Sequence, residues 1–427
     1  MKLSTTALAL TLAVSAAPAA AQYDRPPPPP PPQIPQNIPT GRDDKAQAQP
    51  ADDGKVHPSG KAVKAIVELQ KAVNANDAAN IPALVAAANA VATTKDDRYI
   101  IAQFRLKAAY AANDDAALAS AIDAVAASGY VDNPTTMADL YVALGSKLYN
   151  GKKFDLAANA FEHASTLSPT NTQALINLAE SRFSQGRQAD AVGLFQKAIQ
   201  QRTAAGQKPE EALYKRALGV AYGQQMPVAI ELARQWITAY PSPESWRNGL
   251  ALYQNLAKPD VEGALDVLRL MRATGSLNNS ADFSLYATAA ADQFNYNEAQ
   301  AVIDEGLASK KIDPASPLFR DIINGLKAKP KATRADLEQA LKDAKDGKAF
   351  LRIGDRYLAM NDYAKAAELY RQSIGKPGVD SNVANMHLGI ALARSGDKAG
   401  ATAAFNAVSG NLSPIAKYWL IYVQQQA

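Results

Sequence analysis

The stretch from residue 141 to residue 169 decides the fold class. It reads Tyr141-x-x-Leu144-Gly145-x-x-Leu148, then Ala157-x-x-x-Phe161-x-x-Ala164, and then Pro169. Apolar residues recur here at helical spacing, and a short polar segment with a glycine separates the two runs. The stretch therefore predicts two amphipathic helices joined by a tight turn, and a proline that ends the second helix.

The same pattern recurs along the chain at a nearly constant spacing. The alanines at the equivalent place on each second helix are separated by 34, 38, 35, 35, 67 and 35 residues; they are Ala157, Ala191, Ala229, Ala264, Ala299, Ala366 and Ala401. The spacing of 67 is nearly two periods, which predicts a degenerate repeat between Pro314 and Gly347. Self-similarity at a period of this size is typical of helical repeat proteins.

In this pattern the sequence resembles the tetratricopeptide repeat (TPR) family. The resemblance implies an all-α fold, a right-handed α-solenoid of tandem helix-turn-helix repeats. It also implies that small residues such as Gly145 and Ala157 lie where two helices cross closely, with Phe161 filling the space beside them. Four aromatic residues are expected to pack in the core: Tyr141, Trp246, Phe283 and Phe350.

The repeats divide the chain into three helical parts. Residues 135–412 are predicted to form the TPR array, and residues 59–134 two atypical helical hairpins that lack the Gly/Ala/Phe pattern. In the latter, Asp96-Asp97 and Asp114-Asp115 are expected at helix starts, where carboxylates bind free N–H groups. Residues 413–427 form a C-terminal helix that is apolar on more than one side. We interpret it as a cap, the alternative being a surface for a partner or for self-association.

Residues 1–58 have a different character. A positive start, an apolar run from Leu3 to Ala17 and the small residues Ala19-Ala20-Ala21 predict a signal peptide over residues 1–21, cleaved near Ala21. The alternative is an uncleaved membrane anchor, for which the apolar run is short. Residues 22–58 are a predicted proline-rich linker with seven consecutive prolines, either a spacer or a docking ligand for an aromatic groove. The chain is therefore expected to be exported, periplasmic or secreted, and the alanine-rich composition is typical of bacteria.

The composition argues against several classes of function. The net charge of +4 is too small and too dispersed to favour nucleic-acid binding. The sequence contains no second apolar run that is long enough to predict a membrane span. The chain has no cysteine and only three histidines, which lie far apart in sequence. No zincin, nucleophile-elbow, phosphate-loop or dinucleotide-binding motif is present. We therefore expect no metal, no cofactor and no enzymatic activity.

The resemblance implies a binding surface on the concave face, which first helices line. Exposed polar residues of those helices are the candidate partner-binding residues: Asn177, Glu180, Tyr214, Arg247, Asn248, Arg352, Asp355, His387 and Arg394. For any one of them the alternative is a solvated helix face. The predicted function is a cell-envelope scaffold that binds a peptide or protein partner of unknown identity. The alternative is a module that binds glycan or another small ligand in envelope polysaccharide handling.

Overall fold

The computed structural model describes residues 56–426, and every regular element in this range is a helix. The prediction of an all-α solenoid is confirmed. The predicted signal peptide and all but the last three residues of the predicted linker lie outside the described residues. The chain divides into two compact units, residues 1–207 (unit 1) and residues 208–427 (unit 2).

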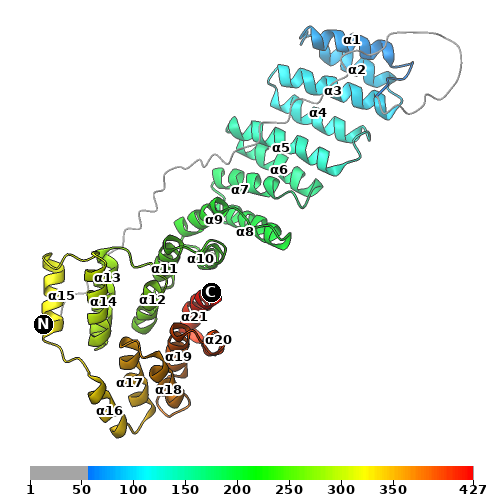
Figure 1. The fold of residues 1–427 in the computed structure, drawn as a ribbon. Coiled ribbons are helices and arrows are strands. Elements are labelled where there is room, and N and C mark those ends of the chain that lie inside the picture. Colours follow the sequence, from blue (N-terminus) through cyan, green and yellow to red (C-terminus); the bar gives the residue numbers. More distant parts are fainter. Residues whose placement is uncertain (1–55, 427) are drawn as a thin grey trace. The chain divides into compact units, whose positions relative to one another are not determined.

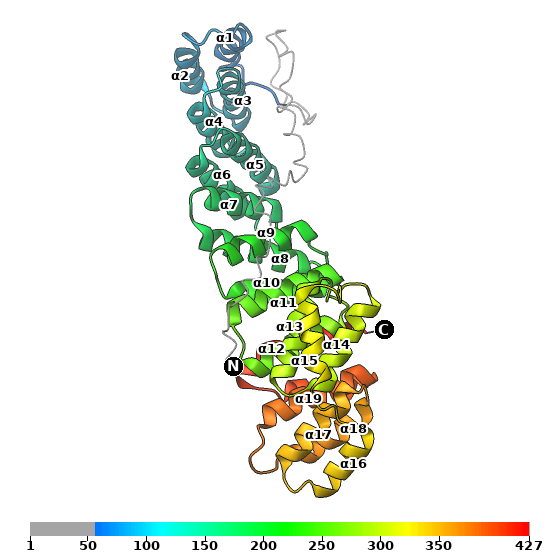
Figure 2. The same cartoon turned by 90° about the vertical axis from the view of Figure 1, so that its left-hand side faces the viewer.

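Unit 1 is a stack of antiparallel helical hairpins, in which each helix packs on the next along the chain (Figure 2). Its helices are α1 (Val63–Asn74), α2 (Ile81–Val91), α3 (Lys95–Ala111), α4 (Asp115–Ala127), α5 (Pro134–Asn150), α6 (Phe154–Leu167), α7 (Thr172–Ser184) and α8 (Gln188–Ala204). The hairpins expected in residues 59–134 are α1–α2 and α3–α4.

Unit 2 continues the hairpin pattern and ends in a single helix. Its helices are α9 (Glu211–Gly223), α10 (Val228–Ala239), α11 (Pro243–Ala257), α12 (Val261–Ala273), α13 (Ser280–Asp292), α14 (Tyr296–Ala308), α15 (Pro317–Lys327), α16 (Arg334–Asp343), α17 (Gly347–Ala359), α18 (Tyr363–Ser373), α19 (Ser381–Ser395), α20 (Lys398–Asn406) and α21 (Ser413–Gln425), with a short 3-10 helix η1 (Gly410–Leu412) before α21. The helices α15 and α16 lie where the degenerate repeat was expected.

Glycines on first helices allow close helix crossings. A Cβ added to Gly145 would lie 2.6 Å from the Phe161 ring, and one added to Gly389 would lie 2.5 Å from the Phe405 ring. Both distances are shorter than a Cβ can tolerate, so a larger residue would force the two helices apart. Gly145 and Phe161 thus lie against each other as the resemblance implied.

One register assignment was wrong. Six of the seven second-helix alanines are fully buried, but Ala264 is only half-buried, while its neighbours Gly263 and Leu265 are buried. The helix that carries it, α12, buries eight of its thirteen residues, far more than one helical stripe. The helix α12 contacts α11, α13 and also α21. Because it is buried on several sides, the sequence pattern of a helix with one buried face does not show which residue takes the buried alanine position.

Acidic residues cap the two helices where they were expected. The Asp114 side chain accepts hydrogen bonds from the N–H groups of Ala116 and Ala117 at the start of α4. At the start of α3, Thr94 and Asp97 form a capping box. The buried Asp97 carboxylate also accepts hydrogen bonds from Ser59 N and Oγ at 2.7 and 2.8 Å. It therefore joins the segment before α1 to the start of α3.

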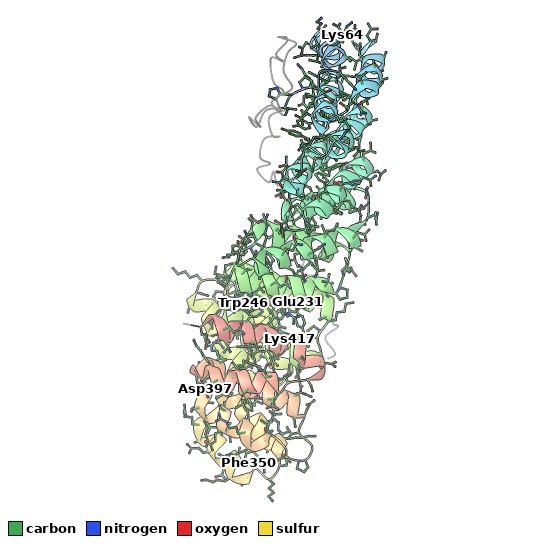
Figure 3. The ribbon with its side chains drawn as sticks, turned by 90° about the vertical axis from the view of Figure 1, so that its right-hand side faces the viewer. Lys64, Glu231, Trp246, Phe350, Asp397 and Lys417 are labelled. Carbon is green, nitrogen blue, oxygen red and sulfur yellow. The ribbon has the colours of Figure 1, made fainter. Side chains whose placement is uncertain are left out.

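Unit 2 curls back on itself through its last helix. In Figure 1, α21 lies beside α10 and α12, which precede it by more than a hundred residues, and Figure 3 labels Lys417 on α21 close to Glu231 on α10. Tyr418 Oη donates a hydrogen bond to the Ile230 carbonyl at 3.2 Å, and Gln425 Nε2 donates one to the Ile237 carbonyl at 3.0 Å. We call this contact of α21 with α10 and α12 the closure.

The closure accounts for the apolar character of α21 on more than one side. One side of the helix packs on α20, where Trp419 stacks on Phe405 with ring centroids 5.8 Å apart. Another side faces α10 to α12, where Tyr418 lies 5.5 Å from the ring of Tyr253. The apolar residues of α21 are therefore buried within unit 2: Ile415, Ala416, Tyr418, Trp419, Ile421 and Val423.

Candidate partner-binding surfaces

A small hollow opens in unit 1 between the first helices α5 and α7. Its lining comes from three consecutive helices of the repeat: Ser146 and Tyr149 on α5, Phe161 on α6, and Asn177 and Glu180 on α7. The first helices α5 and α7 contact each other directly and both pack on α6. Of the nine candidate residues, Asn177 and Glu180 are brought together here.

The polar groups of this hollow are held by neighbours on the same face. Gln173 Nε2 donates to Asn177 Oδ1 at 3.0 Å, which orients the Asn177 amide. The hydroxyl groups of Tyr149 and Ser184 lie 3.1 Å apart and share a hydrogen bond between α5 and α7. Both Asn177 and Glu180 are half-buried, so each leaves part of its side chain in contact with solvent. An amide, a carboxylate and an aromatic edge together suit hydrogen bonding to a peptide.

Tyr214 and Arg247 are engaged within unit 2. Tyr214 is only 4% exposed and packs edge-to-face on Tyr240, so the expectation of an exposed side chain was wrong for this residue. Arg247 donates from Nε and Nη2 to the two carboxylate oxygens of Asp282, at 3.1 and 3.2 Å. This bidentate ion pair joins α11 to α13 and fixes the guanidinium. Its neighbour Asn248 is half-buried.

Two other candidate arginines lie in different settings. Arg352 on α17 is exposed. Arg394 on α19 is half-buried, and its guanidinium donates to the Tyr363 hydroxyl at 3.1 Å and lies 5.5 Å from the centre of that ring. The structure therefore does not gather the unit 2 candidates into one surface.

The last two candidates, Asp355 and His387, belong to a buried charge cluster. We use this name for five residues of unit 2: Asp266 and Arg269 on α12, Glu298 on α14, Asp355 on α17 and His387 on α19. His387 is 6% exposed, so the expectation of an exposed side chain was wrong here too. Its Nδ1 lies 2.8 Å from Asp355 Oδ1, and its Nε2 lies 3.2 Å from Arg269 Nη1 and 3.6 Å from Asp266 Oδ1.

Arg269 is the centre of the buried charge cluster. Its Nε and Nη2 donate to the two oxygens of Glu298 at 2.9 and 2.8 Å, and its Nη1 donates to Asp266 Oδ1 at 2.9 Å. Two tyrosine hydroxyls complete the network: Tyr286 donates to Glu298 at 2.8 Å, and Tyr370 donates to Asp355 at 2.9 Å. The network spans six helices, so the surrounding backbone fixes its geometry.

Burial and neighbouring charges shift the pKa values in this cluster. Burial would raise the pKa of Glu298, but Arg269 outweighs it and holds that pKa below its usual value. Burial likewise opposes ionisation of Asp355, but His387 lowers the pKa of that carboxyl. Burial would lower the pKa of His387, yet Asp355 and Asp266 outweigh it and raise that pKa. Asp266 differs from the other carboxyls, because burial dominates and raises its pKa.

Sequence reasoning missed Asp266, Arg269 and Glu298. A signal for the first two was present, because they stand three residues apart inside the apolar run from Leu265 to Met271. A charged pair at this spacing within such a run indicates burial with a partner. No comparable signal marks Glu298, whose partner lies 29 residues earlier in the chain.

Residues 56–426 contain neither a candidate metal site nor a candidate membrane-spanning helix. In this part of the chain, no cluster of three or more His, Asp or Glu side chains is placed to hold a metal ion. None of the helices described has both the length and the apolar character needed to cross a membrane. Whether any of the nine candidate residues contacts a partner stays a prediction.

Comparisons with known proteins agree with the helical repeats. Residues 142–206 and 351–413 match a family model described as tetratricopeptide repeat. No curated protein matches the chain. A solved TPR protein from Parabacteroides merdae is 12% identical, covers 68% of this chain and 98% of its own, and has a TM-score of 0.28.

Two further solved structures are similar at the same level. The pilF protein of Pseudomonas aeruginosa is 14% identical, covers 62% of this chain and 97% of its own, and has a TM-score of 0.26. The TPR2AB domain of yeast Sti1, solved in complex with pHSP90, is 13% identical, covers 68% of this chain and 99% of its own, and has a TM-score of 0.24.

Proposed function

We propose that this chain is an exported, non-catalytic scaffold of the cell envelope that binds a peptide or protein partner. The proposal rests on the match of residues 142–206 and 351–413 to the tetratricopeptide repeat model. Repeats of this family generally serve as protein–protein interaction scaffolds. The finer parts of the proposal are export, the envelope role and peptide binding. Export rests on the signal-peptide pattern of residues 1–21 and on nothing else.

We assign the binding surface to the hollow between α5 and α7. It is the place where candidate residues from the sequence meet in one concavity, and it lies within a matched region. In unit 2 the candidate residues do not meet in one concavity: Arg247 pairs with Asp282, and Asp355 lies against the buried His387. We therefore assign the partner to the first-helix face of unit 1. The mixture of amide, carboxylate and aromatic groups favours a peptide over a sugar, which stacked exposed aromatics would favour.

A capture experiment with a matched control tests this assignment. The mature chain, residues 22–427, is used to capture proteins from a cell-envelope extract, and so is the double variant Asn177→Ala, Glu180→Ala. The control is Asn159→Ala, Glu162→Ala, which removes the same residue types at the same spacing from the exposed face of α6. We expect a partner that the parent and the control retain and that the hollow variant loses.

The binding of that partner, once purified, is then measured directly. We expect the hollow variant to bind at least about tenfold more weakly, which corresponds to about 1.4 kcal/mol. Equal binding by all three proteins would contradict the assignment to this hollow. Capture of glycan in place of protein would favour the alternative function.

A further inference from the structure

Two helices that carry the buried charge cluster also contact α21. Asp266 and Arg269 come from α12, which α21 covers, and His387 comes from α19, which also contacts α21. The approach of Arg269 Nη1 to His387 Nε2 at 3.2 Å joins residues 118 positions apart in sequence. The cluster therefore links the early and late helices of unit 2 at the place where the unit curls back on itself.

Without an added proton, the buried charge cluster would carry two net negative charges. Arg269 is cationic, and the lowered pKa values of Glu298 and Asp355 keep both ionised, so these three groups carry one net negative charge. If Asp266 were also ionised beside a neutral His387, the buried site would carry two. A second uncompensated charge in a dry interior is costly, because little water is present to solvate it.

The geometry around Asp266 and His387 fits one bound proton. Asp266 Oδ2 is buried and receives no hydrogen bond from residues 56–426, so no donor there stabilises a negative charge on this oxygen. His387 Nε2 lies 3.6 Å from Asp266 Oδ1, within reach of a small side-chain adjustment. Arg269 Nη1 can only donate a hydrogen bond and lies 3.2 Å from His387 Nε2, so in this arrangement Nε2 accepts and the proton resides on Asp266. Movement of His387 Nε2 to Asp266 Oδ1 would allow the proton to transfer, and the ion pair formed would have the same net charge.

We propose that one proton shared by Asp266 and His387 holds unit 2 closed, and that its loss as the pH rises separates α19 and α21 from α10 and α12. The opening would uncover an aromatic inner face that contains Tyr253 and Tyr418, which lie against each other in the closed unit.

Other ionisable groups that face Asp266 and His387 influence the pH at which the shared proton is lost. They are Tyr253 on α11, Glu262 and Arg269 on α12, Tyr286 on α13, Glu298 on α14, Asp355 on α17 and Tyr370 on α18. The pKa of His387 is raised above 6.5 in the closed unit, so its contribution is complete below 6.5 and is lost as the pH rises through the raised value. The raised pKa of Asp266 acts in the same direction. The lowered pKa values of Glu298 and Asp355 act only at acid pH, below 4.5 and 3.8 respectively.

Tryptophan fluorescence reports selectively on this closure. All three tryptophans of the chain, Trp236, Trp246 and Trp419, lie in unit 2, on α10, α11 and α21. Trp246 Nε1 donates to Gln425 Oε1 of α21 at 3.2 Å. Separation of α21 from α10 and α12 would expose these indoles to water and shift their emission to the red. Far-UV circular dichroism recorded on the same samples reports whether the helices persist.

The test compares the tryptophan emission of the parent chain, residues 22–427, with that of two variants. The pH is varied from about 5 to about 9, below the range in which tyrosine ionises. We expect the parent to show a red shift with a midpoint above pH 6.5 and unchanged helix content. Asp266→Asn is permanently neutral, so the red shift should disappear. His387→Gln cannot take the proton, so the shift should move to lower pH. His163→Gln, which alters the histidine stacked on Tyr141 in unit 1, is the control and should behave as the parent.

Three outcomes would overturn the proposal. The first is a parent emission that stays constant over the whole range. The second is an Asp266→Asn variant that titrates as the parent does. The third is a loss of helix that accompanies the red shift, because the cluster would then govern global unfolding of unit 2 and not its opening.

Discussion

Phe294 is an aromatic residue in a backbone conformation that its side chain disfavours. It has φ of +60° in the turn between α13 and α14, and the residues at the corresponding turns of α3–α4 and α17–α18 are Asn113 and Asn361. Asparagine adopts this left-handed region more readily than a bulky residue does. The Phe294 side chain is also 67% exposed, so packing offsets little of the cost.

We therefore expect Phe294→Asn to stabilise unit 2 by about 1 kcal/mol. Urea unfolding followed by tryptophan fluorescence measures this change, because all tryptophans lie in unit 2. A loss of stability would mean that the edge-to-face contact of Phe294 with Tyr296, at 6.2 Å, outweighs the strain.

Asp97 is a second residue whose effect can be isolated. Burial would raise its pKa, but hydrogen bonds from Ser59, Thr93 and Thr94 outweigh burial and lower the pKa from 3.8 to about 2. Its contribution to stability is therefore present above pH 3.8 and is lost as the pH falls towards about 2.

Asp97→Asn should destabilise unit 1 by about 1–3 kcal/mol near neutral pH, because one amide oxygen cannot satisfy these donors. The difference between parent and variant should shrink as the pH falls below 3.8. Thermal unfolding by circular dichroism, with tryptophan fluorescence to identify the unit 2 transition, measures it. The neighbouring substitution Asp96→Asn is the control and should change stability by less than about 0.5 kcal/mol. Equal effects of the two substitutions would contradict the role of Asp97.

At the scale of the helix, the close crossing of α19 and α20 depends on Gly389. An added Cβ would lie within 2.5 Å of the Phe405 ring, which is buried and stacked on Trp419. The ring has little freedom to move, so the two helices must separate to accept even a methyl group.

Gly389→Ala should therefore destabilise unit 2 by about 1–3 kcal/mol, although alanine favours helix. Gly219→Ala is the matched control, because Gly219 lies inside α9 with no atom within 4 Å of an added Cβ. It should stabilise the unit by up to about 1 kcal/mol. Urea unfolding of both variants gives the comparison, and a stabilising Gly389→Ala would refute the close crossing.

At the scale of the whole molecule, the last helix decides how unit 2 is organised. Removal of residues 413–427 takes away the fully buried side chains of Ile415, Tyr418 and Trp419, each worth roughly 2 kcal/mol or more. It also leaves the faces of α10 and α12 uncovered. These contacts of α21 lie within unit 2.

The truncated chain should therefore lose hydrogen-exchange protection in α10 and α12 and keep it in α3 to α7. Exchange measured peptide by peptide on the full chain and the truncated chain tests this expectation. Unchanged protection in α10 and α12 would show that α21 is an appendage and that the closure contributes little.

Local pattern determined the repeats, because what defines them lies within one hairpin. The 3.6-residue period, the turn residues and the pairing of Gly145 with Phe161 all act over fewer than 34 residues. The helix pair α15–α16 could be placed from a gap in the alanine spacing alone. The acidic residues at the starts of α3 and α4 could be interpreted as caps because capping acts within the first turn of one helix.

Only the tertiary structure decided the closure of unit 2 and what it buries. The contacts of α21 with α10 join residues 188 positions apart, and no local period encodes such a pairing. This closure buries α12 on several sides, which is why the register of Ala264 was assigned wrongly. It also places His387 in a buried charge cluster, although its sequence position suggested an exposed first-helix face. The sequence alone determined which helices form, whereas the closure of unit 2 determined that His387 is buried.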